Sequence, residues 1–346
     1  MDNAKNAAPV NDIHLSMGIT VKDLVSQFRN SGFQTHNIGV AADILAEMAE
    51  NNATIFLSFT SNIAASGIRG IIIDLVKRKK VHALVVSSGA LDEDISRAEH
   101  AYLQGTFEAD DAQLGRQGIN RMGNIFVPNE CYEQLEETIT AILGKIHYTM
   151  NELSVTELLR QIGLHMTSEN SFVYHAARNG IPIFCPGITD GAVGLQLAFF
   201  QQTHPNFKVN ELKSAIEALD FAMMAKNPSR QQSQVGSGRL RSPAESGLAT
   251  GSSRASDLGK GKVGAIILGG GIAKHHTIIA NILSGGLDYA IYINSSSPYH
   301  GSLSGATTSE AKSWGKVGEN AKDVTIYGDA SVVFPLLIAS NDYFFE

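Results

Sequence analysis

The stretch GAIILGGGIAKHH (Gly264–His276) combines an apolar run, a glycine triplet and an amphipathic continuation. The apolar run indicates a buried strand, and the residues after the glycines have the spacing of a helix. A strand that passes through glycines into a helix presents backbone N–H groups and a positive helix end, both of which suit a phosphate. The complete dinucleotide fingerprint needs glycine at position 274, where Lys274 stands, so a plain strand-to-helix turn is the alternative interpretation.

The same alternation of strand and helix extends along the chain. Apolar runs predict strands at 53–59, 82–88, 181–184, 264–271, 289–294 and 324–328. Amphipathic segments predict helices at 67–80, 132–147, 155–166 and 275–286. This order favours an α/β fold: a Rossmann-like, mostly parallel sheet with helices on both faces, in a single domain. Ligands of such sheets bind beyond the carboxyl ends of the strands, where TSNIAASGIRG (60–70) and SSGALDED (87–94) suggest one shared nucleotide crevice.

Residues 227–262 interrupt this pattern, because they are rich in Ser, Gly, Arg and Gln and nearly lack bulky apolar side chains. Such a segment cannot bury enough surface to offset its ordering entropy, which predicts a disordered surface insertion. Its excess of Arg and Lys leaves a second interpretation, a tail that binds nucleic acid or an acidic partner. The predicted organisation is an N-terminal extension or helix at 1–35 and one nucleotide-binding domain at 36–346 that carries this insertion.

Bulk composition narrows the classes of function. The 346 residues carry a formal net charge of −7, which does not favour nucleic acid as a partner. No apolar run approaches the roughly 20 residues that span a bilayer, and the polar N-terminus lacks the apolar core of a secretory signal. The two cysteines, Cys131 and Cys185, suit buried thiols in a reducing cytosol better than a disulfide framework. We therefore expect a soluble cytoplasmic protein with no membrane partner.

The stretch SEAKSWGKV (309–317) holds the only tryptophan of the chain, Trp314, two residues before Lys316. A lysine attacks carbon as an amine only when it is neutral, and burial or a neighbouring cation favours that state by lowering its pKa. A helix over 308–316 would place Lys312 one turn from Lys316 and so supply the cation. The indole could exclude water and contact a cationic ligand. The alternative is a solvated lysine at a helix end, with the indole packed beneath it.

The histidines do not indicate a metal site. None of the 11 histidines shows zinc-ligand spacing to Cys, His, Asp or Glu, so no metal is expected. His275 and His276 begin a helix after the glycine turn, and such a pair can equally be one capped surface residue and one packed residue. The stretch GSLSG (301–305) resembles the nucleophile elbow of hydrolases, but its central residue is Leu303, which is no nucleophile.

Seven blocks of the sequence resemble those of the deoxyhypusine synthase family. They occur in family order and cover roughly residues 50–340 apart from the insertion: FTSNIAASGIRG, GINRMGNIFVPNECY, NGIPIFCPGITDGAVG, GAIILGGGIAKHH, DYAIYINSSSPYHGSLSGA, SEAKSWGKV and YGDASVVFPLL. The wording TDGAVG and the spacing FEADD…GINRMGN resemble the archaeal branch most.

The resemblance implies a reaction in which NAD takes hydride from spermidine and diaminopropane leaves. The remaining 4-aminobutyl group is carried as an imine on an enzyme lysine, passes to a lysine of translation initiation factor 5A, and is reduced to deoxyhypusine. The lysine of the family's S-W-G-K motif is here Lys316, and His275 is implied as the second catalytic residue. The family also implies a homotetramer with active sites between subunits.

Family positions carry over one by one. The implied NAD contacts are Ser61, Asn62, Ile63, Ala64, Ala65, Ser87, Ser88, Gly89, Glu93, Asp190, Gly270, Ser295, Ser296, Asp329 and Ala330. The implied polyamine contacts are Asp92, which stands where the family has Glu, and Glu93, His275, Gly301, Ser302, Glu310, Trp314 and Gly315.

Two leucines depart from the pattern of eukaryotic members. Leu195 and Leu303 stand where those members have carboxylates that are expected to hold ammonium groups. Because a buried ammonium needs a carboxylate or equivalent acceptors, both leucines are predicted to line the polyamine site and to loosen its preference for spermidine. The donor is therefore spermidine or a related polyamine.

Two other functions stay open at this point. One is a homospermidine synthase, in which a small diamine replaces the protein acceptor. The other is a catalytically silent, NAD-binding paralogue that regulates an active partner. Retention of Lys316, His275 and Trp314 speaks against the silent paralogue, whereas Leu195 and Leu303 speak for it.

Overall fold

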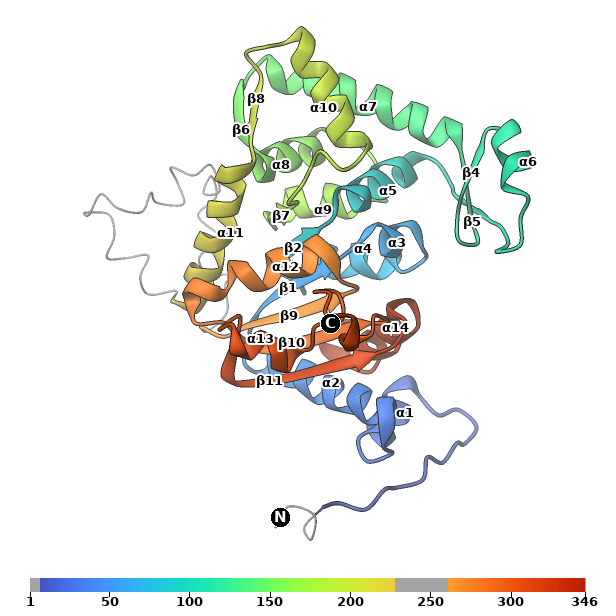
Figure 1. The fold of residues 1–346 in the computed structure, drawn as a ribbon, viewed down its shortest axis with the longest axis vertical. Coiled ribbons are helices and arrows are strands. Elements are labelled where there is room, and N and C mark those ends of the chain that lie inside the picture. The colour runs from blue at the N-terminus through green and yellow to red at the C-terminus, as the bar shows by residue number, and fades with distance from the viewer. Residues whose placement is uncertain (1–6, 228–260, 346) are drawn as a thin grey trace.

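The computed structural model describes residues 7–227 and 261–345. Its centre is a six-stranded sheet with the strand order β11-β10-β9-β1-β2-β7 (Figure 1). All five neighbouring pairs are parallel. The strands are β1 (Thr54–Phe59), β2 (Ala83–Val86), β7 (Ile183–Phe184), β9 (Val263–Leu268), β10 (Leu287–Asn294) and β11 (Val317–Tyr327). The predicted α/β fold with a parallel sheet is confirmed.

Successive side chains of a strand enter two separate cores, one on each face of the sheet. In β1, Ile55 belongs to one core and Phe56 to the other. The first core is covered by α2 (Phe33–Glu50), α4 (Arg69–Lys77), α9 (Phe172–Asn179) and α14 (Ala330–Ala339). The second is covered by α11 (Glu211–Lys226), α12 (Gly271–Ala280) and α13 (Thr308–Ser313). Helices therefore cover both faces, as predicted.

The strand order reverses direction next to β1. The chain runs from β1 through β2 to β7 on one side and returns through β9 and β10 to β11 on the other. Short segments at the carboxyl ends of these strands lead into α3 (Ser61–Ala65), α5 (Ser88–Glu99), α12 and α14. The switch point between β1 and β9 is where an open parallel sheet binds ligands.

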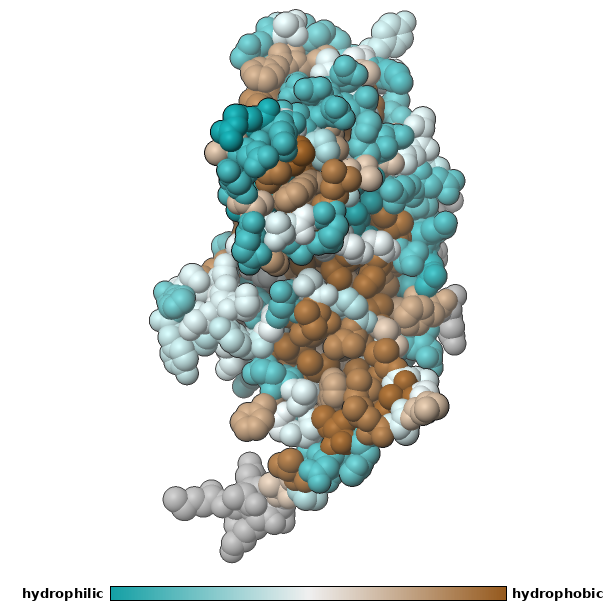
Figure 2. Space-filling model, turned by 90° about the vertical axis from the view of Figure 1, so that its right-hand side faces the viewer, coloured by the Kyte–Doolittle hydropathy of each residue, from teal (hydrophilic) through white to brown (hydrophobic). Residues whose placement is uncertain are grey.

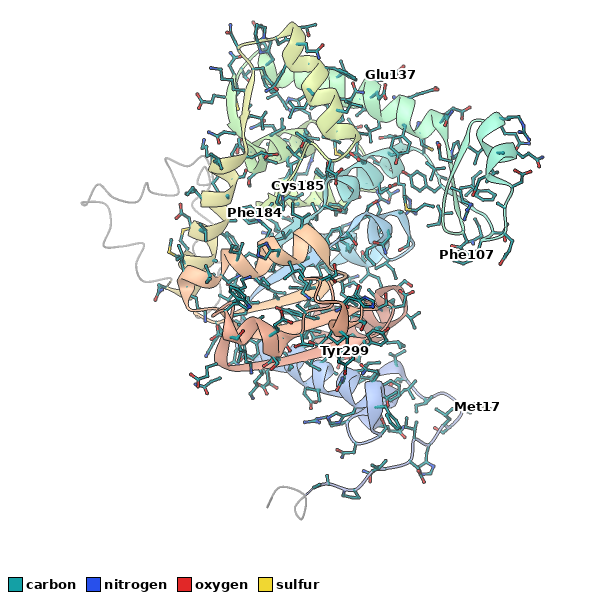
Figure 3. All side chains as sticks on the ribbon, viewed as in Figure 1. Met17, Phe107, Glu137, Phe184, Cys185 and Tyr299 are labelled. Atoms are coloured by element: carbon teal, nitrogen blue, oxygen red, sulfur yellow. The ribbon has the colours of Figure 1, made fainter. Side chains whose placement is uncertain are left out.

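A second group of helices lies beyond β7, the edge strand of the sheet (Figure 1). It consists of α5, α7 (Asn129–His147), α8 (Val155–His165) and α10 (Ala192–Thr203), with the short parallel pair β6 (Glu152–Ser154) and β8 (Lys208–Asn210). Both predicted thiols are buried and unpaired, and Cys185 lies with Phe184 in the interior between this layer and the sheet (Figure 3).

A small arm projects from the right-hand side of Figure 1. It is built from β3 (Leu103–Gln104), α6 (Asp111–Arg116), β4 (Ile119–Met122) and β5 (Ile125–Pro128), and Phe107 lies in it, 66% exposed (Figure 3). The remaining short elements are α1 (Val21–Phe28), η3 (Ile282–Ser284), η4 (Pro298–His300) and η5 (Asp342–Phe344).

The N-terminal helices are continuous with the domain. The predicted boundary between residues 35 and 36 falls inside α2, whose Ile44, Leu45 and Met48 are buried in the core of the sheet. The predicted insertion at 227–262 lies outside the described residues, except for its ends at Asn227, Gly261 and Lys262. In the part of the chain that the structure describes, no helix has both the length and the apolar character that crossing a membrane requires.

Apolar side chains gather on the face that Figure 2 turns toward the viewer, over the lower half of the molecule. In Figure 1, α14 lies on this side, and its Val332 is 61% exposed. Contiguous apolar areas of this kind are more typical of interaction sites than of ordinary solvated surface.

Candidate active site

Lys316 lies in a tight turn between α13 and β11. The helix begins at Thr308 and ends at Ser313, and the hydroxyl of the preceding residue, Thr307, caps it by accepting from the Glu310 N–H. Gly315 has φ +68°, a left-handed conformation that glycine adopts without steric cost, and it turns the chain so that β11 starts at Val317. The predicted helix over 308–316 is therefore too long, and Lys316 is not part of it.

The predicted role of Lys312 is also wrong. Because the helix ends before Lys316, the two lysines do not lie one turn apart on one helical face. The Lys312 ammonium instead pairs with Asp323 of β11 at 2.5 Å. Its charge is compensated there and is not directed at Lys316.

The neighbour of the Lys316 amine is a histidine, not the Lys312 cation that was predicted. The Nζ atom of Lys316 lies 3.3 Å from Nε2 of His275, which α12 projects toward the turn. Burial, and then the nearby Lys316 cation, lower the pKa of His275 from its ordinary value of 6.5. The imidazole is therefore neutral at physiological pH, and Nε2 can accept a proton from the lysine.

Trp314 completes this group of side chains. Its ring centroid lies 5.3 Å from Lys316 Nζ, within the range of a cation–π contact, and the side chain is 65% exposed. The only tryptophan of the chain thus belongs to neither hydrophobic core, because it lies at the surface beside the amine.

A pocket of about 170 Å³ opens next to Lys316. Its lining residues come from α12, β10, the loop at 301–307, α13 and the turn that follows: Lys274, Ile278, Tyr292, Gly301, Leu303, Ala306, Thr307, Glu310, Ala311, Trp314 and Lys316. Glu310 is the only acid among these lining residues. The pocket can therefore pair one ammonium group with a carboxylate, while Leu303 presents an apolar wall.

Sequence reasoning missed six of the lining residues, and two of these, Lys274 and Tyr292, are buried side chains that carry a polar group. The sequence singles out Lys274 only as a break in a glycine fingerprint, yet its side chain is 1% exposed and its ammonium lies 4.6 Å from the centroid of the Tyr292 ring. Tyr292 is fully buried, and its hydroxyl has no hydrogen-bond partner among the described residues. A signal existed in the sequence, since a lone lysine inside an apolar run must either reach solvent or find acceptors in the interior.

Asp92, a predicted polyamine contact, caps a helix within the chain. Its two carboxylate oxygens accept the backbone N–H groups of Ala192 and Val193, at 2.8 and 2.9 Å, at the start of α10. Burial raises the pKa of Asp92, although these hydrogen bonds oppose the shift. Asp92 does not reach the pocket of Lys316 in its own chain.

Glu93 lies buried near the carboxyl ends of β1 and β2. Its carboxylate accepts hydrogen bonds from Ser61 Oγ at 3.2 Å and from the hydroxyls of Tyr102 and Tyr132 at 2.5 and 3.4 Å. Burial raises the pKa of Glu93. The carboxylate thus adjoins the predicted cofactor segments rather than the pocket of Lys316.

The predicted substrate contacts therefore divide into two groups. The pocket brings together Gly301, Leu303, Glu310, Trp314 and Lys316, and His275 lies within hydrogen-bond distance of Lys316. Asp92, Glu93 and Leu195 lie elsewhere, and Leu195 is 50% exposed on α10. Ser302 and Gly315 are exposed neighbours of lining residues.

The predicted cofactor contacts other than Glu93 follow strands of the central sheet at its carboxyl edge. They stand in the segments that open α3, α5, α10, α12 and α14 or follow β10: Ser61, Asn62, Ile63, Ala64, Ala65, Ser87, Ser88, Gly89, Asp190, Gly270, Ser295, Ser296, Asp329 and Ala330. Two of these segments touch, since the Ser61 N–H donates to Ser87 Oγ at 3.1 Å. A Cβ at Gly89 would come within 2.9 Å of Ser61 Cβ, so only glycine allows this approach.

Not every helix start at this edge is available to a phosphate. The Gly271 N–H donates to Ser304 Oγ at 3.0 Å, and the Asp329 carboxylate caps α14 by accepting from the Ser331 N–H at 2.8 Å. The start of α5 at Ser88 has no side-chain cap, so its first N–H groups suit an anion best. Within residues 7–227 and 261–345, His, Cys, Asp and Glu form no group that could hold a metal ion.

Comparisons with known proteins agree with one another. A family model described as deoxyhypusine synthase matches residues 23–238 and 252–341. A protein of Thermoplasma volcanium named probable deoxyhypusine synthase is 40% identical over 333 residues, which cover 96% of each chain. One of the same name from Pyrococcus furiosus is 34% identical over 336 residues, 92% of this chain and 90% of that protein.

A solved structure shows the same fold. An Entamoeba histolytica protein with the same family name superposes with a TM-score of 0.61 at 22% identity, covering 94% of this chain and 93% of that one. The residues that match the family model, 23–238 and 252–341, include the strands of the sheet and the residues that line the pocket of Lys316.

Proposed function

This chain belongs to the deoxyhypusine synthase family of aminobutyl transferases, and on that premise we propose that it transfers the 4-aminobutyl group of spermidine to a lysine of translation initiation factor 5A with NAD as cofactor. The observation that carries the proposal is the contact of 3.3 Å between Lys316 Nζ and His275 Nε2 at the mouth of an amine-sized pocket. A lysine nucleophile needs a neighbouring base, and His275 meets that need.

NAD, when bound, accepts hydride from the carbon next to the reacting amine and later returns it. The residues at the carboxyl edge of the sheet fit such a cofactor. The uncapped start of α5 at Ser88 can receive phosphate oxygens, and Asn62 and Ser61 can bind hydroxyl or amide groups beside it. The absence of a side chain at Gly89 keeps the two segments close enough to form one cradle.

The residues of the pocket perform the transfer. His275 takes a proton from the Lys316 ammonium, and the neutral amine then attacks the oxidised carbon of the donor. A bond forms between Lys316 Nζ and that carbon, the bond between the carbon and the departing diamine breaks, and the departing nitrogen leaves with a proton. Trp314 lies beside the amine, and Glu310 can pair with the free ammonium of the donor.

The acceptor lysine then reverses these steps. Its neutral amine attacks the carbon that Lys316 holds, a bond forms between the acceptor nitrogen and the carbon, and Lys316 is released with a proton. His275 again stands where the proton must move. The exposure of Trp314 and Glu310 at the pocket mouth supports access by a lysine that another protein presents.

We further propose a cytoplasmic homotetramer whose active sites lie between subunits. Two free thiols, Cys131 and Cys185, support a reducing compartment, and the apolar face in Figure 2 supports an interface. If Glu93 and Leu195 serve the pocket of Lys316, they do so in a neighbouring subunit, because within one chain they lie elsewhere. Mixing two inactive variants, Lys316→Arg and Glu93→Gln, should then restore part of the activity. Mixtures that stay inactive under conditions of subunit exchange would contradict shared sites.

The decisive experiment incubates the purified protein with NAD, radiolabelled spermidine and a factor 5A homologue. We expect label on one lysine of the acceptor protein, dependent on NAD, together with release of diaminopropane. Label that appears only on an added small diamine would assign homospermidine synthesis instead. Binding of NAD without release of diaminopropane would assign the silent regulatory paralogue.

A further inference from the structure

Lys274 is a buried charge that the proposed reaction does not use. It lies on α12 directly before His275, and its side chain is 1% exposed. A buried ammonium destabilises the fold unless acceptors compensate it. Here burial lowers the pKa of Lys274 to about 8, so the side chain is still charged at neutral pH. Methionine would fill the same space without that cost, which calls for another reason to have lysine there.

The acceptors of Lys274 belong to a single loop. Its ammonium donates to the carbonyl oxygens of Ala306 and Ser304, at 2.6 and 3.2 Å. The loop closes on itself through the Gly305 N–H, which donates to Ser302 O at 3.1 Å, and the Ala306 N–H, which donates to Leu303 O at 3.2 Å. Its Gly301 and Leu303 form one wall of the pocket.

A second contact ties the same loop to the start of α12. Ser304 Oγ accepts the Gly271 N–H at 3.0 Å, and a Cβ at Gly270 would come within 2.5 Å of Ser304. Two residues thus attach loop 301–306 to α12: Ser304 contacts the first turn of the helix, and the Lys274 ammonium binds two carbonyls of the loop. Lys274 also lines the pocket, together with Tyr292 and the loop residues Gly301, Leu303 and Ala306.

We propose that Lys274 is a positioning residue that holds loop 301–306 in the conformation that shapes the amine pocket. The inference rests on the proposed function, since it assigns loop 301–306 to the binding of the amine donor. Lys274 does not touch the reacting atoms. It acts through the backbone carbonyls of Ser304 and Ala306, which hold Gly301 and Leu303 in the wall of the pocket that Glu310 and Lys316 also line.

The test compares Lys274→Met, Lys274→Arg and Lys77→Met. Methionine keeps most of the volume and removes the donors, and arginine keeps a cation that can reach both carbonyls. Lys77 is an exposed lysine of α4, so its replacement controls for the loss of one charge. Steady-state rates give KM for spermidine and kcat, thermal melts give Tm, and hydrogen–deuterium exchange follows the peptide 299–307.

We expect Lys274→Met to raise KM for spermidine about tenfold, the cost of losing one charge-assisted contact, with kcat and the affinity for NAD within about twofold. Its Tm should be unchanged or higher, since a buried charge is removed. Exchange should speed up in peptide 299–307 and not in β9 or β10. Lys274→Arg should recover part of the lost affinity, and Lys77→Met should match wild type.

Two outcomes would overturn the proposal. One is an unchanged KM and unchanged exchange of 299–307 in Lys274→Met. The other is a lowered Tm with faster exchange throughout β9 and β10, which would make Lys274 a residue of the core rather than of the pocket. If wild type shows no turnover at all, the proposed function fails, and the exchange measurement alone still decides whether Lys274 holds the loop.

Discussion

The amine of Lys316 and the imidazole of His275 lie 3.3 Å apart although 41 positions separate them in the chain. Two turns create this contact: the glycine turn that starts α12 and the turn at Gly315 that ends α13. His275 lies in the middle of α12, and Lys316 stands between the end of α13 and the start of β11, so the packing of α12 and α13 on one face of the sheet fixes the distance between them.

Replacing Lys316 by arginine tests the nucleophile. The guanidinium group in Lys316→Arg keeps a cation near Trp314 but cannot lose a proton at physiological pH, so it cannot form an imine. We expect aminobutyl transfer to be abolished and NAD affinity to stay within about twofold, because the cofactor segments lie at the sheet edge. Borohydride with NAD and spermidine should trap label on Lys316 in wild type only. Transfer at the wild-type rate in the variant would contradict the assignment.

The pH dependence of the rate tests the base. The pKa of His275 is lowered below 6.5, and the base acts only when neutral. The value of kcat/KM should therefore be flat from pH 6.5 to about 8, where Lys274 begins to lose its charge, and fall as the pH drops through the lowered pKa of His275. In His275→Gln this acid limb should disappear, with a loss of about 10²- to 10⁴-fold in rate. An acid limb that persists in the variant would assign the titration to another group.

Leu303 tests the charge balance of the pocket. Glu310 is the only acid among the described residues that line it, so a second carboxylate opposite should pair with a second ammonium of the donor. We expect Leu303→Asp to tighten spermidine binding by about 1.5–3 kcal/mol, roughly ten- to a hundredfold. The measurement is the ratio of kcat/KM for spermidine to that for a monoamine, with Leu212→Asp, on the exposed face of α11, as the control. Unchanged discrimination would show that other acceptors already hold that ammonium.

One carboxylate forms ion pairs with lysines at both ends of the insertion at 227–262. Asp288 pairs with Lys226 at 2.6 Å and with Lys262 at 3.3 Å. Because the ends already meet, replacing residues 228–260 by a short Gly/Ser linker should leave turnover within about twofold and Tm unchanged or slightly higher. A large fall in Tm would show that the removed sequence contributes to the folded domain.

The pH dependence of stability tests the buried lysine. The pKa of Lys274 is about 8 in the folded protein, against an ordinary value of 10.5. Between these values the unfolded chain binds a proton that the folded protein lacks, so the free energy of unfolding gains a contribution that rises with pH. Relative to Lys274→Met, wild type should become more stable from about pH 8 to 10.5, as measured by denaturant unfolding. A difference between the two proteins that is flat over this range would show that burial does not perturb Lys274.

Most of the sheet could be predicted because apolar runs mark its strands, although in β11 only the second half is such a run. Buried parallel strands need that pattern, and helices between them leave few other arrangements. The end of α13 could not be placed in the same way. The sequence Ser313-Trp314-Gly315-Lys316 is compatible with one more helical turn, and only the positive φ of Gly315 shows that the helix has already ended.

The site could be predicted only in part for a similar reason. Asp92 and Glu93 are adjacent in sequence and suggest one shared ligand, but successive residues of a helix point about 100° apart. Asp92 therefore caps α10, whereas Glu93 meets the tyrosines and Ser61. The role of Lys274 could not be predicted from the sequence, because its hydrogen-bond acceptors are backbone carbonyls, which carry no sequence signal. These carbonyls belong to residues 30 and 32 positions further along the chain.

The solitary indole has an optical consequence. Since Trp314 is the only tryptophan of the 346 residues, the emission of the protein under selective excitation comes from one ring, 5.3 Å from the Lys316 amine. Protonation of that amine, its conversion to an imine and the arrival of a polyamine each alter the field and the polarity around the ring. The molecule thus carries its own fluorophore at the pocket mouth, and stopped-flow fluorescence can follow each chemical stage without a label.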